Sequence, residues 1–307
     1  MIITPLSILR HSSKFSGVNI FSRILSFPIS IVVAMVLSPE DYGIIGYVGV
    51  IVSWAGFVNL GMMSTAQREM PGLIEAGDLS RARFLQNQAI TVEGIITIAL
   101  GLGLLSIAFI LDDFVTKAIM VLGAVGFVAS RIYSFLEGIN FAFKDFTLSA
   151  KGRLLHSILY PALTIAFIFW LKIYTPPVVA LLVTTTVIGY LLRQRDYDVY
   201  LVFNSAELLR MAKIGLSLTA GSILYTVFTG TLDKTLISAY LSKEELGLYV
   251  FAYNMLAMIL GIFKDYASVL KPVIWGYAAN VADAREGFAV VKDMGIYFSE
   301  GYGLSES

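Results

Sequence analysis

Five ionisable side chains lie well inside long apolar stretches of the sequence. They are Arg23, Glu93, Arg131, Asp233 and Lys234. An ionisable group near the middle of a membrane helix costs about 2.5–3.5 kcal/mol on insertion scales, so it usually faces protein or water. A guanidinium has five donors in a fixed geometry and suits the oxygens of a phosphate-type anion, which makes Arg23 the leading candidate for a ligand contact. The alternative is that its long side chain extends back to the membrane surface.

Arg23 belongs to a polar stripe, because polar side chains around it recur at spacings of three and four and so share one helical face. The stripe consists of Ser16, Asn19, Arg23, Ser26 and Ser30. A second stripe with the same spacing consists of Thr219, Ser222, Thr226, Thr229 and Asp233, with Lys234 beside it. Two such stripes that face each other would line a hydrated cavity. The candidate substrate-binding residues on these stripes are Asn19, Arg23, Asp233 and Lys234.

The other charged candidates leave alternatives open. Asp233 and Lys234 could form a pair, a cation site or substrate contacts, and a structural salt bridge is an equal alternative. Glu93 and Arg131 lie at equal depth in adjacent stretches, which favours a structural ion pair because pairing relieves the insertion cost of both. The alternative is that Arg131 adds positive charge to a substrate path. Lys264 could supply positive charge for substrate entry, or it could only anchor its helix at the membrane surface.

The composition indicates that these residues belong to a membrane protein. The chain has 307 residues, of which 57% are hydrophobic and 14% are charged, with a mean hydropathy of +0.78. An average soluble domain is about 45–50% apolar and about 25% charged, so the chain is predicted to be a membrane protein. Its 22 basic and 22 acidic residues cancel, which argues against a nucleic-acid partner. With no cysteine and two histidines, a metal site or other bound cofactor is not expected.

A bilayer core needs about 20 apolar residues of helix, and the chain contains about eight such stretches. They cover residues 15–37, 42–62, 84–111, 115–141, 154–173, 176–192, 214–241 and 246–270. Connections 63–83, 142–153 and 193–213 are basic, whereas the intervening ones are short and hold single lysines at most. The expected fold is therefore an all-α, polytopic membrane helix bundle in the cytoplasmic membrane, with a cytoplasmic N-terminus. The first stretch is a retained helix, since no small-residue cleavage site follows it.

The frame L-S-x-E-x-x-G occurs twice, at residues 37–43 and 241–247. In both copies serine can cap the following helix, acidic residues lie at its positive end and glycine allows close packing. The first stretch thus corresponds to the seventh, which gives a repeat of six helices in two parallel copies. Residues 1–205 are then a complete six-helix lobe with a charged linker. Residues 206–307 are the start of a second lobe, with helices seven and eight followed by a cytoplasmic tail or the beginning of helix nine.

Four segments carry a family resemblance: LSPEDYG at 37–43, NLGMMSTAQRE at 59–69, LDKTLISAYLSKEELGLYVFAYNM at 232–255 and KPVIWG at 271–276. They resemble the polysaccharide flippases of the O-antigen and teichuronic-acid type, within the multidrug/oligosaccharidyl-lipid/polysaccharide exporter superfamily. The resemblance implies a transporter that moves a polyprenyl-pyrophosphate-linked oligosaccharide across the membrane for surface polysaccharide biosynthesis. The family has further C-terminal helices, so the chain resembles a C-terminally truncated member.

The resemblance implies partners of three kinds: the lipid-linked oligosaccharide, membrane lipids, and glycosyltransferases or a polymerase of the same pathway. Three other functions remain as alternatives: a multidrug cation antiporter of the same superfamily, a membrane enzyme acting on polyprenyl-linked sugars, and an inactive truncated product. The sequence contains no P-loop and no H-E-x-x-H motif, and the predicted outer connections are only a few residues long. A transporter is therefore favoured over an enzyme.

Overall fold

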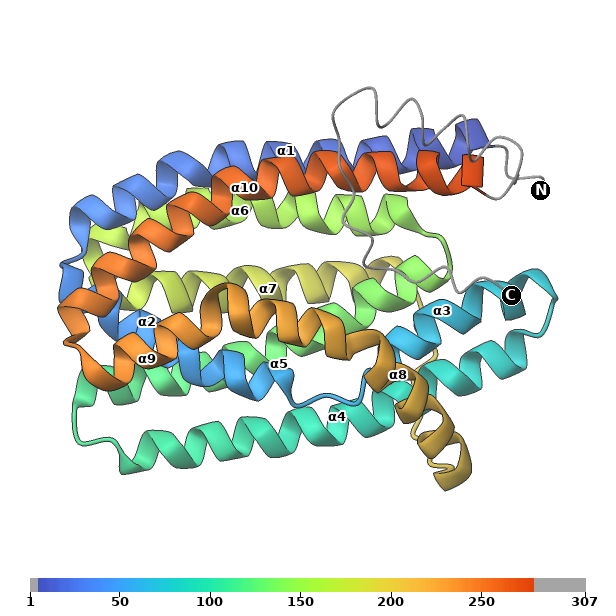
Figure 1. Ribbon diagram of the computed structural model, residues 1–307, viewed down its shortest axis with the longest axis horizontal. Coiled ribbons are helices and arrows are strands. Elements are labelled where there is room, and N and C mark those ends of the chain that lie inside the picture. Colours follow the sequence, from blue (N-terminus) through green and yellow to red (C-terminus); the bar gives the residue numbers. More distant parts are fainter. Residues whose placement is uncertain (1–4, 279–307) are drawn as a thin grey trace.

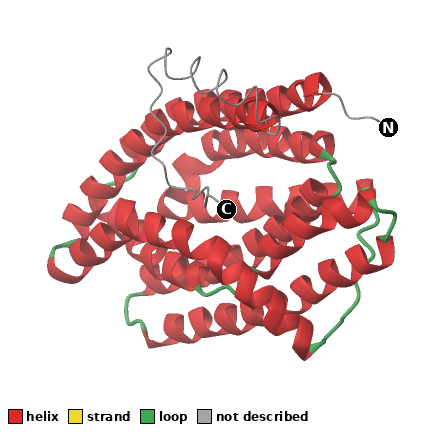
Figure 2. Cartoon of the chain, turned by 45° about the vertical axis from the view of Figure 1, so that its right-hand side comes forward, coloured by secondary structure: helices red, strands yellow, loops and turns green. Residues whose placement is uncertain are grey.

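The computed structural model describes residues 5–278, and every regular element in that range is helical (Figures 1 and 2). The helices are α1 (Pro5–Val36), α2 (Pro39–Phe57), α3 (Met62–Glu75), α4 (Leu79–Ile110), α5 (Phe114–Ala142), α6 (Phe146–Leu171), α7 (Thr175–Gln194), α8 (Ser205–Thr226), α9 (Leu232–Tyr240) and α10 (Lys243–Ala278). A short 3-10 helix, η1 (Lys172–Tyr174), joins α6 to α7, and a π-helical turn, η2 (Val227–Thr231), joins α8 to α9. The predicted all-α fold is confirmed.

Four helical stretches of the described residues are long and apolar enough to cross a membrane: Leu79–Ile110, Phe114–Ala142, Phe146–Gln194 and Ser205–Tyr240. The bent pair α2 and α3 makes a fifth, and α1 contributes a shorter apolar segment, Phe21–Val36. The stretch Phe146–Gln194 contains α6 and α7, which the sequence predicts as two spans. The polytopic character predicted from hydropathy is therefore confirmed.

The connections between helices gather at two ends of the bundle (Figure 1). The α1–α2, α4–α5 and α9–α10 turns lie at the left end, whereas the α3–α4, α5–α6 and α7–α8 connections lie at the right end. Aspartates begin several of these helices: Asp78, Asp113 and Asp145 each accept a backbone N–H of the helix that follows. The hydrogen bond from the Arg81 backbone holds the pKa of Asp78 below its usual value, and the hydrogen bonds from Thr116 do the same for the pKa of Asp113.

The two copies of the repeated turn motif meet each other where α2 packs against α10. Ser38 forms a capping box with Asp41, and Ser242 makes the equivalent pair of bonds with Glu245, at 2.9 and 3.2 Å. The glycines of the motif meet the opposite copy: a Cβ at Gly43 would collide with the backbone of Lys243, and one at Gly247 with the backbone of Pro39. The motif glycines are thus needed because two helix starts approach each other at backbone distance.

The structure differs from the sequence expectation after α2. The predicted span 42–62 ends early at Phe57, and the predicted connection 63–83 contains a further helix, α3, which is bent by 53° from α2. Asn59 and Gly61 form the break, with Gly61 in the left-handed region at φ 62° and the Asn59 side chain accepting its N–H at 2.9 Å. α3 buries one methionine-rich face against α4 and α5. Because only one face is apolar, the hydropathy of this segment predicts a connection and not a span.

Buried amides on α4 hold the segment that leads from α7 to α8. The Gln88 side chain donates to the carbonyl of Asn204 at 3.1 Å and accepts its N–H at 2.9 Å. Gln86 and Asn87 bond in the same way to backbone groups of residues 197–200. Such bonds satisfy backbone groups of a non-helical segment, which has no helical hydrogen bonds of its own. The start of α8 is thereby fixed against the N-terminal part of α4.

Candidate functional site

A cavity of about 420 Å³ lies between α1, α5, α6 and α10. Its lining consists of Ser22, Arg23 and Ser26 from α1, Tyr133 from α5, Arg153, His156 and Ser157 from α6, and Met258 from α10. Two guanidinium groups, an imidazole and four hydroxyls therefore surround one space. We call it the Arg23 pocket.

Arg23 is the sequence candidate that lines this pocket. Its guanidinium lies so close to α10 that a Cβ at Gly261 would collide with it. Glycine at this position therefore lets the guanidinium approach the α10 backbone. Two turns further along α1, the Ser30 hydroxyl contacts the Met258 sulfur at 3.5 Å. α1 and α10 thus position Arg23 together.

Arg153 forms a bidentate salt bridge with Glu137 of α5. Its Nε donates to Oε1 at 2.7 Å and its Nη2 donates to Oε2 at 3.0 Å. The Tyr133 hydroxyl donates to the same Oε1 at 3.1 Å. One turn after Arg153, the His156 ring stacks on Tyr160, with the ring centroids 5.8 Å apart. This network fixes the Arg153 guanidinium at the wall of the Arg23 pocket.

The pocket is suited to an anion rich in oxygen. Guanidinium groups bind phosphate-type oxygens through paired hydrogen bonds, and serine hydroxyls add further donors. In the part of the chain that the structure describes, no group of three histidine, cysteine, aspartate or glutamate side chains is placed to hold a metal ion.

Asp233 and Lys234 lie at a different place in the fold. Lys234 lines a smaller cavity, of about 230 Å³, between α2, η2, α9 and α10, and its Nζ lies 3.8 Å from the centroid of the Tyr253 ring. Asp233 is exposed and accepts the Tyr249 hydroxyl at 3.0 Å. Lys234 and Arg23 therefore line different cavities, which share only α10.

The structure brings Glu93 and Arg131 together. Arg131 Nη2 lies 3.5 Å from Glu93 Oε2, and the second oxygen of Glu93 accepts the backbone N–H of Met63 at 3.1 Å. The Glu93 side chain is only 4% exposed, so this carboxylate is held by both contacts inside the bundle. Asn19 and Lys264 lie on α1 and α10, but their side chains are outside the described part of the structure.

The two polar stripes have different surroundings. α1 packs against α6 and α10, whereas α8 packs against α3. Along α8, the hydroxyls of Thr219, Thr226 and Thr229 each donate to a carbonyl four residues earlier in the helical run. The space beside Arg23 is completed by α5, α6 and α10.

The α6 residues of the pocket are not among the candidates predicted from the sequence. Arg153 lies in the predicted basic connection 142–153, and His156 is one of the two histidines. The spacing R-x-x-H places both side chains on one face of α6, and this spacing is the signal that could have identified them.

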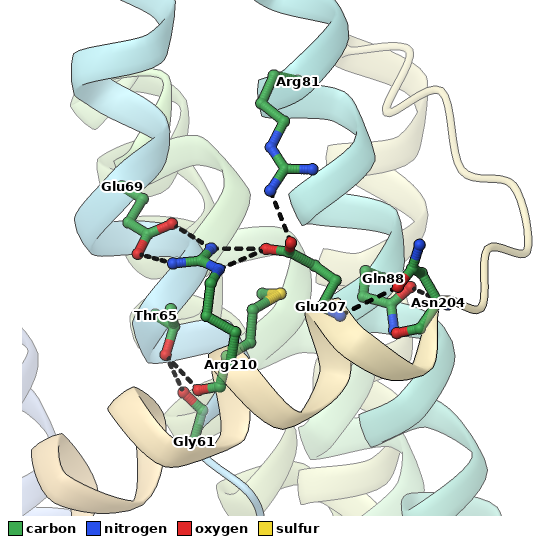
Figure 3. Close-up of polar contacts among 9 residues, drawn as sticks. Gly61, Thr65, Glu69, Arg81, Gln88, Asn204, Glu207 and Arg210 are labelled. Carbon is green, nitrogen blue, oxygen red and sulfur yellow. Dashed lines mark hydrogen bonds and ion pairs between the residues drawn. The ribbon is translucent and has the colours of Figure 1, made fainter.

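A cluster of alternating charges joins α3, α4 and α8 (Figure 3). Arg210 of α8 donates to both carboxylate oxygens of Glu69, at 2.8 and 2.7 Å, and to Glu207 at 2.6 Å. Arg81 of α4 donates to the other oxygen of Glu207 at 2.7 Å. Beside this ion cluster, the hydroxyl of Thr65 donates to the carbonyl of Met211 at 2.9 Å. The N-terminal half of α8 is thus bound to the helices that precede it.

Known proteins were compared with the chain by sequence and by fold. No curated protein sequence matches the chain. A crystal structure of a mutant of a MATE protein is similar, with a TM-score of 0.61 and 15% sequence identity over 93% of this chain and 70% of that chain. The polysaccharide biosynthesis protein family matches residues 32–296. The chain therefore belongs to the polysaccharide biosynthesis protein family and is a multi-pass membrane protein whose fold is similar to that of the MATE protein.

Proposed function

We propose that the protein takes part in moving a polyprenyl-pyrophosphate-linked oligosaccharide across the cytoplasmic membrane, and that the Arg23 pocket binds the pyrophosphate. The observation that carries the proposal is the pocket itself, where Arg23 and Arg153 come from different helices and line one cavity. Two guanidinium groups match a group with several charged oxygens. Glycosyltransferases or a polymerase of the same pathway would supply or consume this substrate.

We also propose which end of the bundle faces the cytoplasm and how the chain divides into two lobes. The end that carries the α3–α4, α5–α6 and α7–α8 connections is rich in arginine and lysine, so it faces the cytoplasm by the positive-inside rule. The N-terminus then lies on the cytoplasmic side. Residues 1–205 act as one lobe and residues 206–307 as part of a second, and the ion cluster lies near the cytoplasmic side between them.

Export of surface polysaccharide tests the proposed site. In a host strain that lacks the native gene, the Arg23→Ala variant should reduce export at least tenfold at unchanged protein abundance. The Arg23→Lys variant should restore export only in part, because an ammonium keeps the charge but loses the fork geometry. The matched control is Arg193→Ala, which removes an exposed arginine at the end of α7. Normal export by Arg23→Ala would refute the role of the pocket.

A further inference from the structure

The carboxylate of Glu137 makes the contact with Arg153 that a phosphate group would make. Its two oxygens accept from Nε and Nη2 of one guanidinium, at 2.7 and 3.0 Å. This parallel pair of hydrogen bonds is the geometry by which arginine binds both carboxylates and phosphates. A phosphate that enters the Arg23 pocket and the Glu137 side chain therefore compete for the same donors.

We propose that Glu137 is an internal competitor of the substrate anion: it holds Arg153 while the pocket is empty and yields this guanidinium when a phosphate group binds. The inference rests on the proposed function and identifies Arg153 as a second anion-binding residue. It also gives Glu137 the role of limiting affinity. A transporter has to release its cargo, and a carboxylate that can retake the arginine favours release.

The surroundings of the pair fit an exchange of partners. The Arg153 side chain is 33% exposed and lines the pocket, whereas the Glu137 side chain is 15% exposed and is not part of the lining. Tyr133, which does line the pocket, donates its hydroxyl to Glu137. A carboxylate displaced from Arg153 therefore keeps this hydrogen-bond donor, which lowers the cost of displacement.

The ion pair of Glu93 on α4 and Arg131 on α5 is a suitable control for the pair of Glu137 and Arg153. It also joins a glutamate to an arginine inside the bundle, but by a single contact of 3.5 Å, and neither residue lines the Arg23 pocket. The same substitution of glutamate by glutamine can thus be made at both places. Only the change at Glu137 removes a competitor from the pocket.

Binding of inorganic pyrophosphate to the purified full chain in lipid nanodiscs tests the proposal by calorimetry. The Glu137→Gln variant should bind about tenfold more tightly than the wild type, because the amide carries no negative charge to compete for Arg153. Glu93→Gln should stay within about twofold of the wild type. If Glu137 only holds Arg153 in position, Glu137→Gln will bind more weakly or equally, and this outcome overturns the proposal.

Two further variants keep the outcomes distinct. Glu137→Asp retains the charge but is one methylene too short to keep both hydrogen bonds, so it should tighten binding a few-fold even if the glutamine variant fails to fold. Arg23→Ala separates the two proposals. Unchanged binding by Arg23→Ala together with tighter binding by Glu137→Gln refutes the role of Arg23 and supports that of Glu137. An absence of pyrophosphate binding in every variant refutes both.

Discussion

Two of the contacts that helices α8–α10 make with the preceding helices are built in different ways. Where α10 meets α2, the contact is between backbones, with Gly43 against Lys243 and Gly247 against Pro39. Where α8 meets α3 and α4, Arg210 bonds to carboxylates on either side of it. The first contact depends on shape, whereas the bonds of Arg210 to the two carboxylates depend largely on charge. They should therefore respond differently to substitution and to salt.

The difference follows from the side chains available at each place. A backbone contact has no side chain that can move aside, so any added atom must displace a whole helix. Arg81 and Arg210 of the ion cluster are each 40% exposed, and an exposed ion pair gives only about 0.2–1 kcal/mol because water and salt screen it. The α2–α10 contact should thus be strict in sequence, whereas the ion cluster should tolerate change.

The largest effect is expected for Gly43→Val. Overpacking in a core costs about 1–3 kcal/mol, and a valine facing the backbone of Lys243 should reach or exceed the upper end of this range. The thermal midpoint of the purified protein should fall by roughly 10 °C, or the protein should fail to accumulate. Thermal unfolding followed by tryptophan fluorescence measures the change.

The matched control for that prediction is Gly49→Val on the same helix. A Cβ at Gly49 would meet nothing within 4 Å, so this variant carries the same change in helix propensity without the collision. Equal midpoints for the two variants would show that the close approach of α2 and α10 contributes little to stability.

A smaller effect is expected for Arg210→Ala. The substitution removes the hydrogen bonds to Glu69 and Glu207, but the exposure of the arginine limits the cost to about 1 kcal/mol. The thermal midpoint should then fall by about 2–4 °C. Arg193→Ala should leave it within about 1 °C, since surface substitutions away from such contacts change stability by less than about 0.5 kcal/mol. A drop as large as that of Gly43→Val would contradict the proposed ranking.

Features that depend on residues close together in the sequence could be predicted, whereas contacts between distant residues could not. The capping boxes at Ser38 and Ser242 and the apolar stretches are local patterns, and the structure shows both. α3 was missed because its burial depends on which helices pack around it. Arg153 and Arg210 each bond to a glutamate on another helix, 16 and 141 residues away, so only the folded chain shows that Glu137 and Glu69 bond to them.

The smallest expected effect concerns salt, and it separates the two contacts most directly. Raising the ionic strength from about 0.1 to 1 M shortens the Debye length from about 10 to 3 Å, which weakens exposed ion pairs and leaves backbone packing unchanged. The midpoint of the wild type should therefore fall by about 1 °C relative to that of Arg81→Ala/Arg210→Ala, in which the ion cluster has lost both of its arginines. Gly49→Val keeps the cluster and should retain the salt response of the wild type. A salt response that persisted in the double variant would place its origin elsewhere in the bundle. In that case Arg210 would hold α8 through its hydrogen-bond geometry, which salt does not screen. The ion cluster would then resemble the α2–α10 contact more closely than its charges indicate.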